Sequence, residues 1–294
     1  MSDYLVKAIT AGVRVYAAVT TDLVGEAVRR HDCYPIAAAA VGRTMTGALL
    51  MAANLKNEEA ITISFRGNGP IGTITADATA DGYVRGYAGN PHVNLPLNEN
   101  GKLDVGGAVG QGLVTVTRFT GLKEPMSGSV EIVTGEIAED LTQYMFASEQ
   151  TPSSIGLGVL VESDFKVSAA GGFMIQLMPD ADEETVSRLE ENLKSLRPVT
   201  SMIADGLDAE AIIKEVMQGF EMEFLSTTEL SFRCQCSKER IEDVLFSLSR
   251  ADLKTLVDDG QAEICCHFCG EKYHFTGEEL AHILKLVDGL EADK

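Results

Sequence analysis

Apolar and polar residues alternate with a period of two at the start of the chain. Residues 5–10 and 13–20 are predicted as strands joined by Ala11-Gly12. A helix is expected to follow through about Arg30, with Asp22 able to cap it. Pro35 can open a second helix, whose Ala-rich sequence through Leu55 has apolar groups on several faces. We expect that helix to be largely buried.

The period of two returns at residue 61, where Ile61, Ile63 and Phe65 share one side. Glycine tolerates positive φ, so Asn68-Gly69 and Asp81-Gly82 favour tight hairpin turns. Further strands are predicted over 71–76, 83–87, 112–119, 129–134, 155–161 and 173–178, with a short helix over 139–147. Residues 1–178 are therefore predicted to form an N-terminal α+β core domain with an antiparallel-rich sheet.

The pattern changes to amphipathic helices at Pro179. Residues 182–196 and 208–220 are acidic helical segments, separated by Pro198 and Gly206. One apolar stripe in the first segment consists of Val186, Leu189, Leu193 and Leu196. We interpret residues 179–230 as a helical linker, whose apolar stripe must pack against another surface.

A short strand-like stretch near Leu230 leads into a small C-terminal module, residues 231–294. Its helices are predicted over 238–247, 251–257 and 277–287. Thr276 and Glu279 have the spacing of a capping box at the start of the last helix. The chain is thus predicted to contain a core domain, a linker and a cysteine-containing module.

The formal net charge is −20, and the linker is the most acidic part. Residues 179–230 carry 4 basic and 13 acidic groups, whereas residues 231–294 carry 8 and 13. Nucleic acid is bound by Lys and Arg that displace counterions, so this balance argues against a nucleic-acid partner. Solubility is the simplest interpretation of the charge.

The N-terminus, Met1-Ser-Asp-Tyr4, lacks the basic start and apolar run of a secretory signal. No uncharged apolar stretch of about 20 residues predicts a membrane span. We therefore expect a soluble cytoplasmic protein with no membrane partner. In that reducing compartment, six cysteines favour metal ligands or redox thiols over a structural disulfide framework.

Four of these cysteines form two pairs near the C-terminus. The first pair is Cys234 and Cys236, and the second is Cys266 and Cys269, with 29 residues between Cys236 and Cys266. Four thiolates suit one tetrahedral Zn²⁺, and Gly270 can take the positive φ of a metal-binding turn. The spacing predicts a zinc site that is either structural or regulatory. Cysteines two apart close a small, strained disulfide ring, which shifts the balance towards regulation.

The other candidate ligands rank lower. Cys265 neighbours Cys266 and is expected to be a spare thiol, because adjacent side chains in an extended segment point in opposite directions. Cys33 is expected to be a small buried side chain. His267 and His274 are possible ligands, but four thiolates already complete the coordination shell.

Three other functions would use motifs that are present in this sequence. A nucleic-acid-binding zinc module conflicts with the acidic charge. A dinucleotide-binding oxidoreductase would use Gly67-Asn-Gly-Pro-Ile-Gly72, but this stretch contains proline and leads into another strand, so a hairpin is predicted.

A thiol-disulfide oxidoreductase would place Cys266-His-Phe-Cys269 at a helix N-terminus, whereas the residues on both sides of this motif have the pattern of strands. Gly106–Gly112 lacks the Lys-Ser/Thr ending of a phosphate loop, so ATP use is not expected.

Several segments together resemble the 33 kDa chaperonins, also called 33 kDa heat-shock proteins, a family of redox-regulated bacterial chaperones. The resemblance rests on the two cysteine pairs and on sequence stretches that cover essentially the full chain. These stretches are Tyr4–Ala8, Thr21–His31, Ser148–Ser153 and Ala169–Gln176.

The resemblance implies an ATP-independent holdase that is not an enzyme. The reduced form would bind one Zn²⁺ through Cys234, Cys236, Cys266 and Cys269 and would be inactive. Oxidation would form the disulfides Cys234–Cys236 and Cys266–Cys269, release the metal and unfold the module and linker. The active protein, a homodimer, would then bind unfolding client proteins. Cys265 departs from the family pattern and leaves another disulfide pairing open.

Overall fold

The computed structural model describes residues 2–10, 12–56, 58–122 and 124–292 of the chain. It contains two compact units that divide after Arg233, close to the expected start of the C-terminal module at residue 231. Residues 179–233 belong to the larger unit. A separate linker beginning at residue 179 therefore stays a prediction. The α+β class with antiparallel sheets is confirmed.

One sheet of the larger unit contains five antiparallel strands in the order β10-β1-β2-β9-β8. The strands are β1 (Tyr4–Thr10), β2 (Val13–Val19), β8 (Ser153–Val161), β9 (Val167–Leu177) and β10 (Glu223–Glu229). The predicted first hairpin is confirmed, because β1 and β2 pair from Tyr4 opposite Val19 to Thr10 opposite Val13. Its predicted turn includes Ala11, which lies outside the described residues.

A second sheet contains six strands in the order β11-β5-β4-β3-β6-β7. They are β3 (Ala60–Gly67), β4 (Thr73–Thr79), β5 (Tyr83–Ala88), β6 (Gly112–Phe119), β7 (Met126–Glu131) and β11 (Ser231–Phe232). Only β11 pairs in parallel, with β5. The strand predicted over 129–134 begins and ends earlier, because its register with β6 runs from Met126 to Glu131.

The glycine-rich stretch between β3 and β4 joins two antiparallel strands, as predicted. A Cβ atom on Gly67 or Gly69 would lie 1.8 or 2.2 Å from the carbonyl oxygens of Val109 and Ala108. These glycines therefore allow close approach of the short helix α3 (Val105–Val109), which the sequence pattern does not predict. Close backbone packing therefore accounts for glycine at these two positions.

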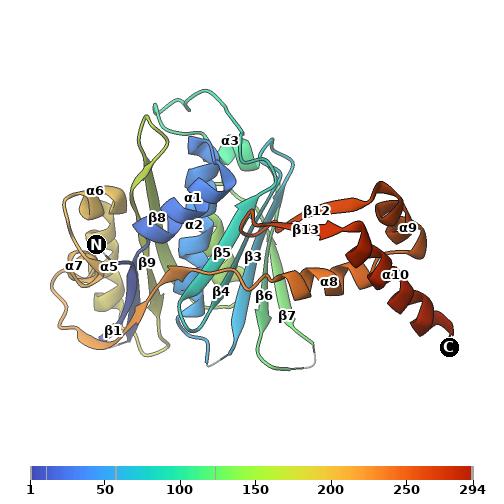
Figure 1. Ribbon diagram of the computed structural model, residues 1–294. Coiled ribbons are helices and arrows are strands. Elements are labelled where there is room, and N and C mark those ends of the chain that lie inside the picture. Colours follow the sequence, from blue (N-terminus) through green and yellow to red (C-terminus); the bar gives the residue numbers. More distant parts are fainter. Residues whose placement is uncertain (1, 11, 57, 123, 293–294) are drawn as a thin grey trace. The chain divides into compact units, whose positions relative to one another are not determined.

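Helices α1 (Thr21–His31) and α2 (Pro35–Ala52) lie between the two sheets (Figure 1). Sixteen of the eighteen α2 residues are buried, so the expected burial is confirmed. The helix is long and apolar enough to cross a membrane by length and composition alone, a weak signal that core helices also give. Helix α4 (Ala138–Ala147) matches its predicted position.

The N-terminus of α1 is capped by a residue from outside the helix. Asp3 Oδ1 and Oδ2 accept hydrogen bonds from the backbone N–H groups of Asp22 and Leu23 at 3.1 and 2.6 Å. The helix begins at Thr21, so the prediction that Asp22 caps it is wrong. Burial raises the pKa of Asp3 to about 6, although both backbone hydrogen bonds act in the opposite direction.

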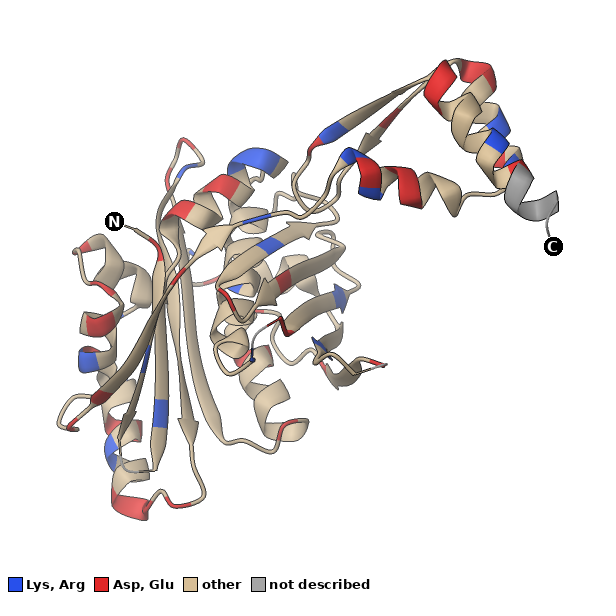
Figure 2. Cartoon of the chain, turned by 60° about the horizontal axis from the view of Figure 1, so that its bottom comes forward, with Lys and Arg blue, Asp and Glu red and all other residues tan. Residues whose placement is uncertain are grey.

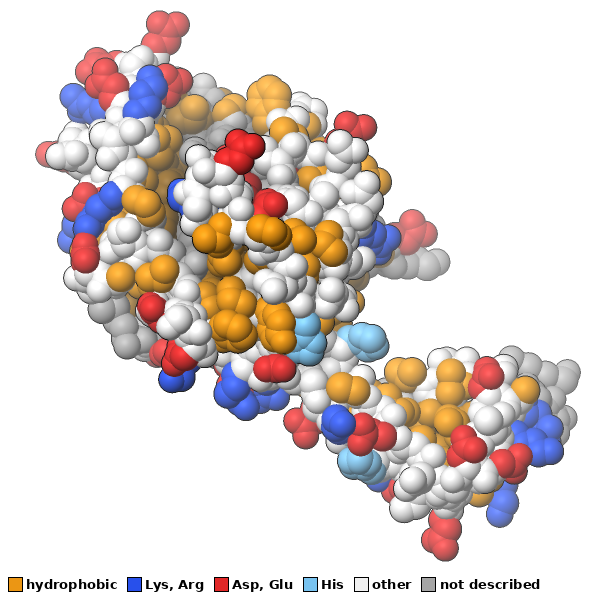
Figure 3. Space-filling model, turned by 90° about the horizontal axis from the view of Figure 1, so that it is seen from above, with side chains coloured by type: hydrophobic (Ala, Val, Ile, Leu, Met, Phe, Trp, Pro, Cys, Tyr) orange, Lys and Arg blue, Asp and Glu red, His pale blue; other side chains and the backbone are white. Residues whose placement is uncertain are grey.

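The predicted linker covers the other face of the five-stranded sheet with α5 (Glu183–Ser195), α6 (Val199–Ala204) and α7 (Ala209–Val216) (Figure 1). Leu189 is buried there, and Leu193 and Leu196 are partly buried. Most of their acidic side chains face solvent. Figure 2 marks the charged positions along these helices, and Figure 3 shows charged side chains on this side of the molecule. Helix α6 was not predicted, and β10 is longer than the stretch expected near Leu230.

The smaller unit consists of an antiparallel hairpin and three helices. Its elements are α8 (Lys238–Phe246), α9 (Arg250–Asp259), β12 (Gln261–Cys265), β13 (Lys272–Thr276) and α10 (Gly277–Ala292). Its core is centred on the buried side chains Leu245, Leu253, Phe275, Leu280 and Ile283. The capping box is confirmed, because Thr276 N–H donates to Glu279 Oε2 at 2.8 Å and Glu279 N–H donates to Thr276 Oγ1 at 3.3 Å.

Candidate metal centre

Two short segments of the smaller unit bring four cysteines together. Cys234 and Cys236 lie between β11 and α8, and Cys266 and Cys269 lie in the turn between β12 and β13. The N–H groups of Cys269 and Gly270 both donate to the carbonyl oxygen of Cys266, at 3.4 and 2.8 Å. Gly270 has φ +71°, as expected for the glycine of a metal-binding turn. The turn joins two strands, unlike the helix N-terminus that thiol-disulfide oxidoreductases use.

The four Sγ atoms lie within 4.8 Å of one another. Cys234 Sγ lies 3.7 Å from Cys266 Sγ, and Cys236 Sγ lies 3.4 Å from Cys269 Sγ. Tetrahedral zinc with bonds of about 2.3 Å to sulfur requires sulfurs about 3.8 Å apart. The donor set therefore fits one Zn²⁺ in both chemistry and spacing.

Burial affects the acidity of two of these thiols. It raises the pKa of Cys266 and of Cys269, and hydrogen bonding to neighbouring sulfurs raises the pKa of Cys269 further. Four thiolates this close would repel one another in a partly buried site. A cation held by the sulfurs would oppose both effects and favour the deprotonated ligands.

Tyr273 adds a contact that sequence reasoning did not identify. Its hydroxyl donates to Cys236 Sγ at 3.1 Å, and this hydrogen bond raises the pKa of Tyr273. The pairing of Tyr273 with Ile264 across the β12–β13 hairpin places it beside the turn that holds Cys266 and Cys269. Hydrogen bonds to ligand atoms orient them and tune metal affinity.

The remaining cysteines lie outside the four-sulfur cluster. Cys265 is exposed on β12, opposite Lys272. Cys33 is buried in the core of the larger unit, and burial raises its pKa to about 12, as expected of an inert thiol. Within the part of the chain that the structure describes, neither His267 nor His274 belongs to a group of side chains arranged to hold a metal.

Known proteins are similar to this chain over nearly its full length. The family model for "Hsp33 protein" matches residues 3–276. A 33 kDa chaperonin from Bacillus velezensis is 50% identical over 285 residues, covering 96% of this chain and 98% of the relative. A 33 kDa chaperonin from Desulforamulus reducens is 48% identical over 291 residues, covering 98% and 99% of the two chains.

A solved structure is similar over the full length. The crystal structure of a 33 kDa chaperonin from Thermotoga maritima has a TM-score of 0.92 and 35% sequence identity to this chain. The similarity covers 100% of both chains. The similarity therefore extends to both units and is not limited to the cysteine segments.

Proposed function

The chain belongs to the Hsp33 family of chaperones, and from that premise we propose that it is a redox-regulated, ATP-independent holdase that prevents aggregation of unfolding proteins. The observation that carries this proposal is the cluster of four sulfurs within 4.8 Å of one another. Relatives named chaperonins support a role other than that of an enzyme.

In the reduced form, Cys234, Cys236, Cys266 and Cys269 would hold one Zn²⁺. The bound ion would keep the sulfurs as thiolates and join the two segments of the smaller unit. The small core of that unit supports a structural contribution from these cysteines, because five buried side chains exclude little apolar surface from water. The reduced form is the inactive one in this proposal.

Oxidation would pair Cys234 with Cys236 and Cys266 with Cys269. For each pair, one peroxide accepts two electrons and two protons as two thiolates form a sulfur–sulfur bond, and two water molecules leave. In the reduced arrangement, the short sulfur contacts cross between the segments. The proposed pairing therefore requires local rearrangement and removes the four ligands together.

The linker would supply most of the apolar surface that binds clients. Its helices cover Val15, Ala17 and Ile175 on one face of the five-stranded sheet. Arg233 alone separates β11 from Cys234 along the chain, so unfolding of the cysteine segment would reach the last strand of the larger unit directly. Release of α5–α7 would expose apolar surface on both the sheet and the helices, and a chain with net charge −20 would help keep a bound client in solution.

We further propose that the protein is cytoplasmic and that its activated form is a homodimer. Its partners would be unfolded proteins and not nucleic acid or membranes. Residues 1–178, 179–230 and 231–294 would act as core, linker and redox-switch module.

The test is to treat the zinc-loaded protein with peroxide at elevated temperature. Metal release is followed with a chromogenic chelator and client aggregation by light scattering. We expect about one Zn²⁺ released per chain, and client protection that appears with the release. Zinc loss with continued client aggregation would contradict the switch. Undiminished protection after deletion of residues 179–230 would contradict the role of the linker.

A further inference from the structure

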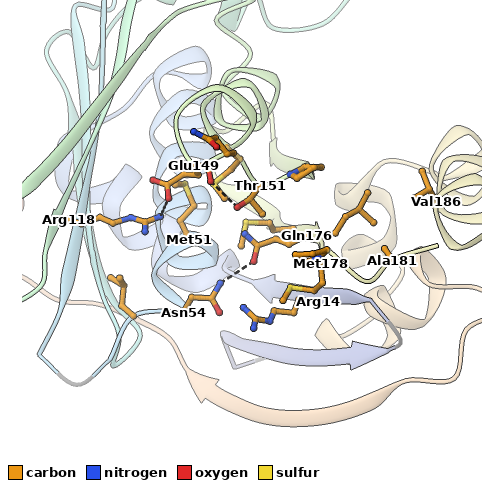
Figure 4. Close-up of a pocket in the computed structure, with 17 residues that line it drawn as sticks. Arg14, Met51, Asn54, Arg118, Glu149, Thr151, Gln176, Met178, Ala181 and Val186 are labelled. Carbon is orange, nitrogen blue, oxygen red and sulfur yellow. Dashed lines mark hydrogen bonds and ion pairs between the residues drawn. The ribbon is translucent and has the colours of Figure 1, made fainter. Parts of the chain in front are cut away.

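A hollow of about 530 Å³ lies in the larger unit, between one end of the five-stranded sheet, the C-terminal end of α2 and the start of the linker (Figure 4). Its volume lies within the range of small-molecule sites, about 300–1,000 Å³. Four methionines line it: Met51, Met145, Met174 and Met178. Methionine side chains are flexible and polarizable, and they adapt to apolar ligands of different shape.

Two hydrogen-bond donors meet at one side of the hollow. Arg14 and Gln176 are directly opposite each other on β2 and β9, so their side chains leave the same face of the sheet. Gln176 is only 6% exposed, and its Oε1 accepts from Asn54 Nδ2 at 3.1 Å. Asn54 Oδ1 in turn accepts from the Tyr16 hydroxyl at 2.6 Å. This chain of hydrogen bonds fixes Gln176 while leaving its amide N–H groups as donors (Figure 4).

Arg14 carries a positive charge that no carboxylate of the described residues neutralises. Lys7, on the neighbouring strand, likewise has no ion pair among them, and burial and repulsion by Arg14 lower its pKa. Arg118 on the opposite wall is already paired with Glu149 at 3.0 Å. Two unneutralised cations side by side are unexpected in a chain of net charge −20, and they favour an anionic ligand.

We propose that this hollow binds a monocarboxylate with an apolar tail, the carboxylate against Arg14 and Gln176 and the tail among the methionines. A guanidinium group matches a planar carboxylate through two parallel hydrogen bonds. A smaller apolar hollow beneath α5 shares Pro152, Leu177 and Val186 with the first, so the apolar lining continues under the linker helix.

The ligand would also regulate the proposed switch. Pro179, Ala181 and Val186 of the linker form one wall, and Met178 N–H is hydrogen-bonded to the Gly12 carbonyl oxygen at 2.8 Å. The site is therefore complete only while the linker is docked. A ligand that binds the docked form alone stabilises it by mass action and slows activation. This regulatory step rests on the proposed holdase function, whereas binding does not.

The binding test uses octanoate with the reduced, zinc-loaded full-length protein in isothermal titration calorimetry. We expect octan-1-ol, which has the same tail without the carboxylate, to bind at least about tenfold more weakly. Arg14→Gln should weaken octanoate binding by a similar factor, and Arg14→Lys by less. Arg29→Gln, the matched control, removes an equal charge from an exposed site on α1 and should leave the affinity unchanged. Thermal melting of each variant verifies that it is folded.

The position of the ligand is checked with methyl-labelled methionine by NMR. Octanoate should shift the signals of Met51, Met174 and Met178 but not that of Met126, which is exposed on β7. No binding of octanoate, equal binding to wild type and Arg14→Gln, or shifts confined to other methionines would each overturn the site.

The regulatory step is tested by peroxide activation with octanoate at ten times its wild-type dissociation constant. Activation should be about tenfold slower in wild type and at most about twofold slower in Arg14→Gln, whose affinity is about tenfold lower. Unchanged or faster activation in wild type would overturn the regulation while leaving the calorimetric result intact. Failure of the oxidised protein to protect clients without octanoate would instead contradict the holdase proposal.

Discussion

Tyr273 and Cys236 illustrate how one hydroxyl can tune a thiolate site. The hydrogen bond at 3.1 Å places a donor on a sulfur that already lies 3.4 Å from Cys269 Sγ. A donor of this kind stabilises the thiolate and fixes the direction in which it faces the other three sulfurs.

Tyr273→Phe is therefore expected to lower zinc affinity by about tenfold. Competition with a chromogenic chelator measures the change. Cys265→Ser is the control, since this exposed thiol lies outside the cluster and its loss should leave the affinity unchanged. Equal affinities in Tyr273→Phe and wild type would show that the hydroxyl does not act on the metal site.

Asp3 is a buried carboxyl group that links the start of β1 to the start of α1. Its pKa is raised from 3.8 to about 6, chiefly by burial. Between these pH values, the folded chain retains a proton that the unfolded chain has released. The contribution of Asp3 to the free energy of unfolding therefore falls as the pH rises from about 4 to about 6. It is independent of pH above that range.

We expect this contribution to fall by about 1–3 kcal/mol between pH 4 and pH 7. Asp3→Asn removes the titration, so the difference in unfolding free energy between wild type and variant should decrease across the same window. Urea denaturation at several pH values measures it. A difference that is independent of pH would contradict the raised pKa.

The β12–β13 turn is the element that positions half of the cysteine cluster. Its geometry depends on Gly270, which has φ +71° in a region that side chains disfavour. Gly270→Ala should lower the stability of the zinc-loaded smaller unit by about 1–2 kcal/mol.

Gly25→Ala is the matched control, because a Cβ there meets nothing within 4 Å and the residue lies inside α1. This substitution should increase stability by about 0.5–1 kcal/mol. Chemical denaturation followed by NMR signals from each unit separates the two effects. Equal responses to both substitutions would argue against backbone strain at Gly270.

Helix α5 is held to the sheet by a narrow apolar stripe. Leu189 is 4% exposed, whereas its neighbour Glu190 faces solvent. Leu189→Ala should weaken docking of the linker by about 2–4 kcal/mol, because a buried leucine leaves both lost contacts and a cavity.

We expect the reduced Leu189→Ala variant to be cleaved faster by protease within residues 179–222, because its linker is docked less tightly. The same variant should require less oxidation for client protection. Glu190→Ala, at the adjacent exposed position, should change neither property. Unaltered proteolysis of Leu189→Ala would show that α5 docking does not depend on the stripe.

The two units of the molecule differ in how much core supports them. The larger one has two apolar cores with many fully buried side chains. The core of the smaller one contains five buried residues in the part of the chain that the structure describes. Domains with small cores depend more on metals or disulfides for their stability.

Removing zinc from the reduced protein with a chelator should therefore unfold residues 238–287 while leaving the two sheets of the larger unit intact. Hydrogen exchange followed by mass spectrometry measures both regions at once. Protection should fall in α8–α10 and persist in β2, β3 and α2. Retained protection throughout would indicate that the four cysteines contribute little to folding of the smaller unit.

Much of this organisation follows from local sequence. The period of two along residues 5–20 and 61–65 is sufficient to predict strands, and two cysteine pairs with Gly270 are sufficient to predict a four-sulfur cluster and its turn. These features depend on residue type and spacing within a few positions, which is the range over which such patterns are informative.

Other features depended on contacts between segments far apart in the chain. β10 pairs with β1, Asp3 caps α1, and Arg14 meets Gln176 only because β2 and β9 are neighbours in one sheet. The sequence by itself determined the residue types, the local elements and the cysteine chemistry. Tertiary structure alone decided which carboxylate is buried, which cations have no carboxylate partner among the described residues, and which sulfurs lie closest. Those properties arise from long-range packing that no local pattern encodes.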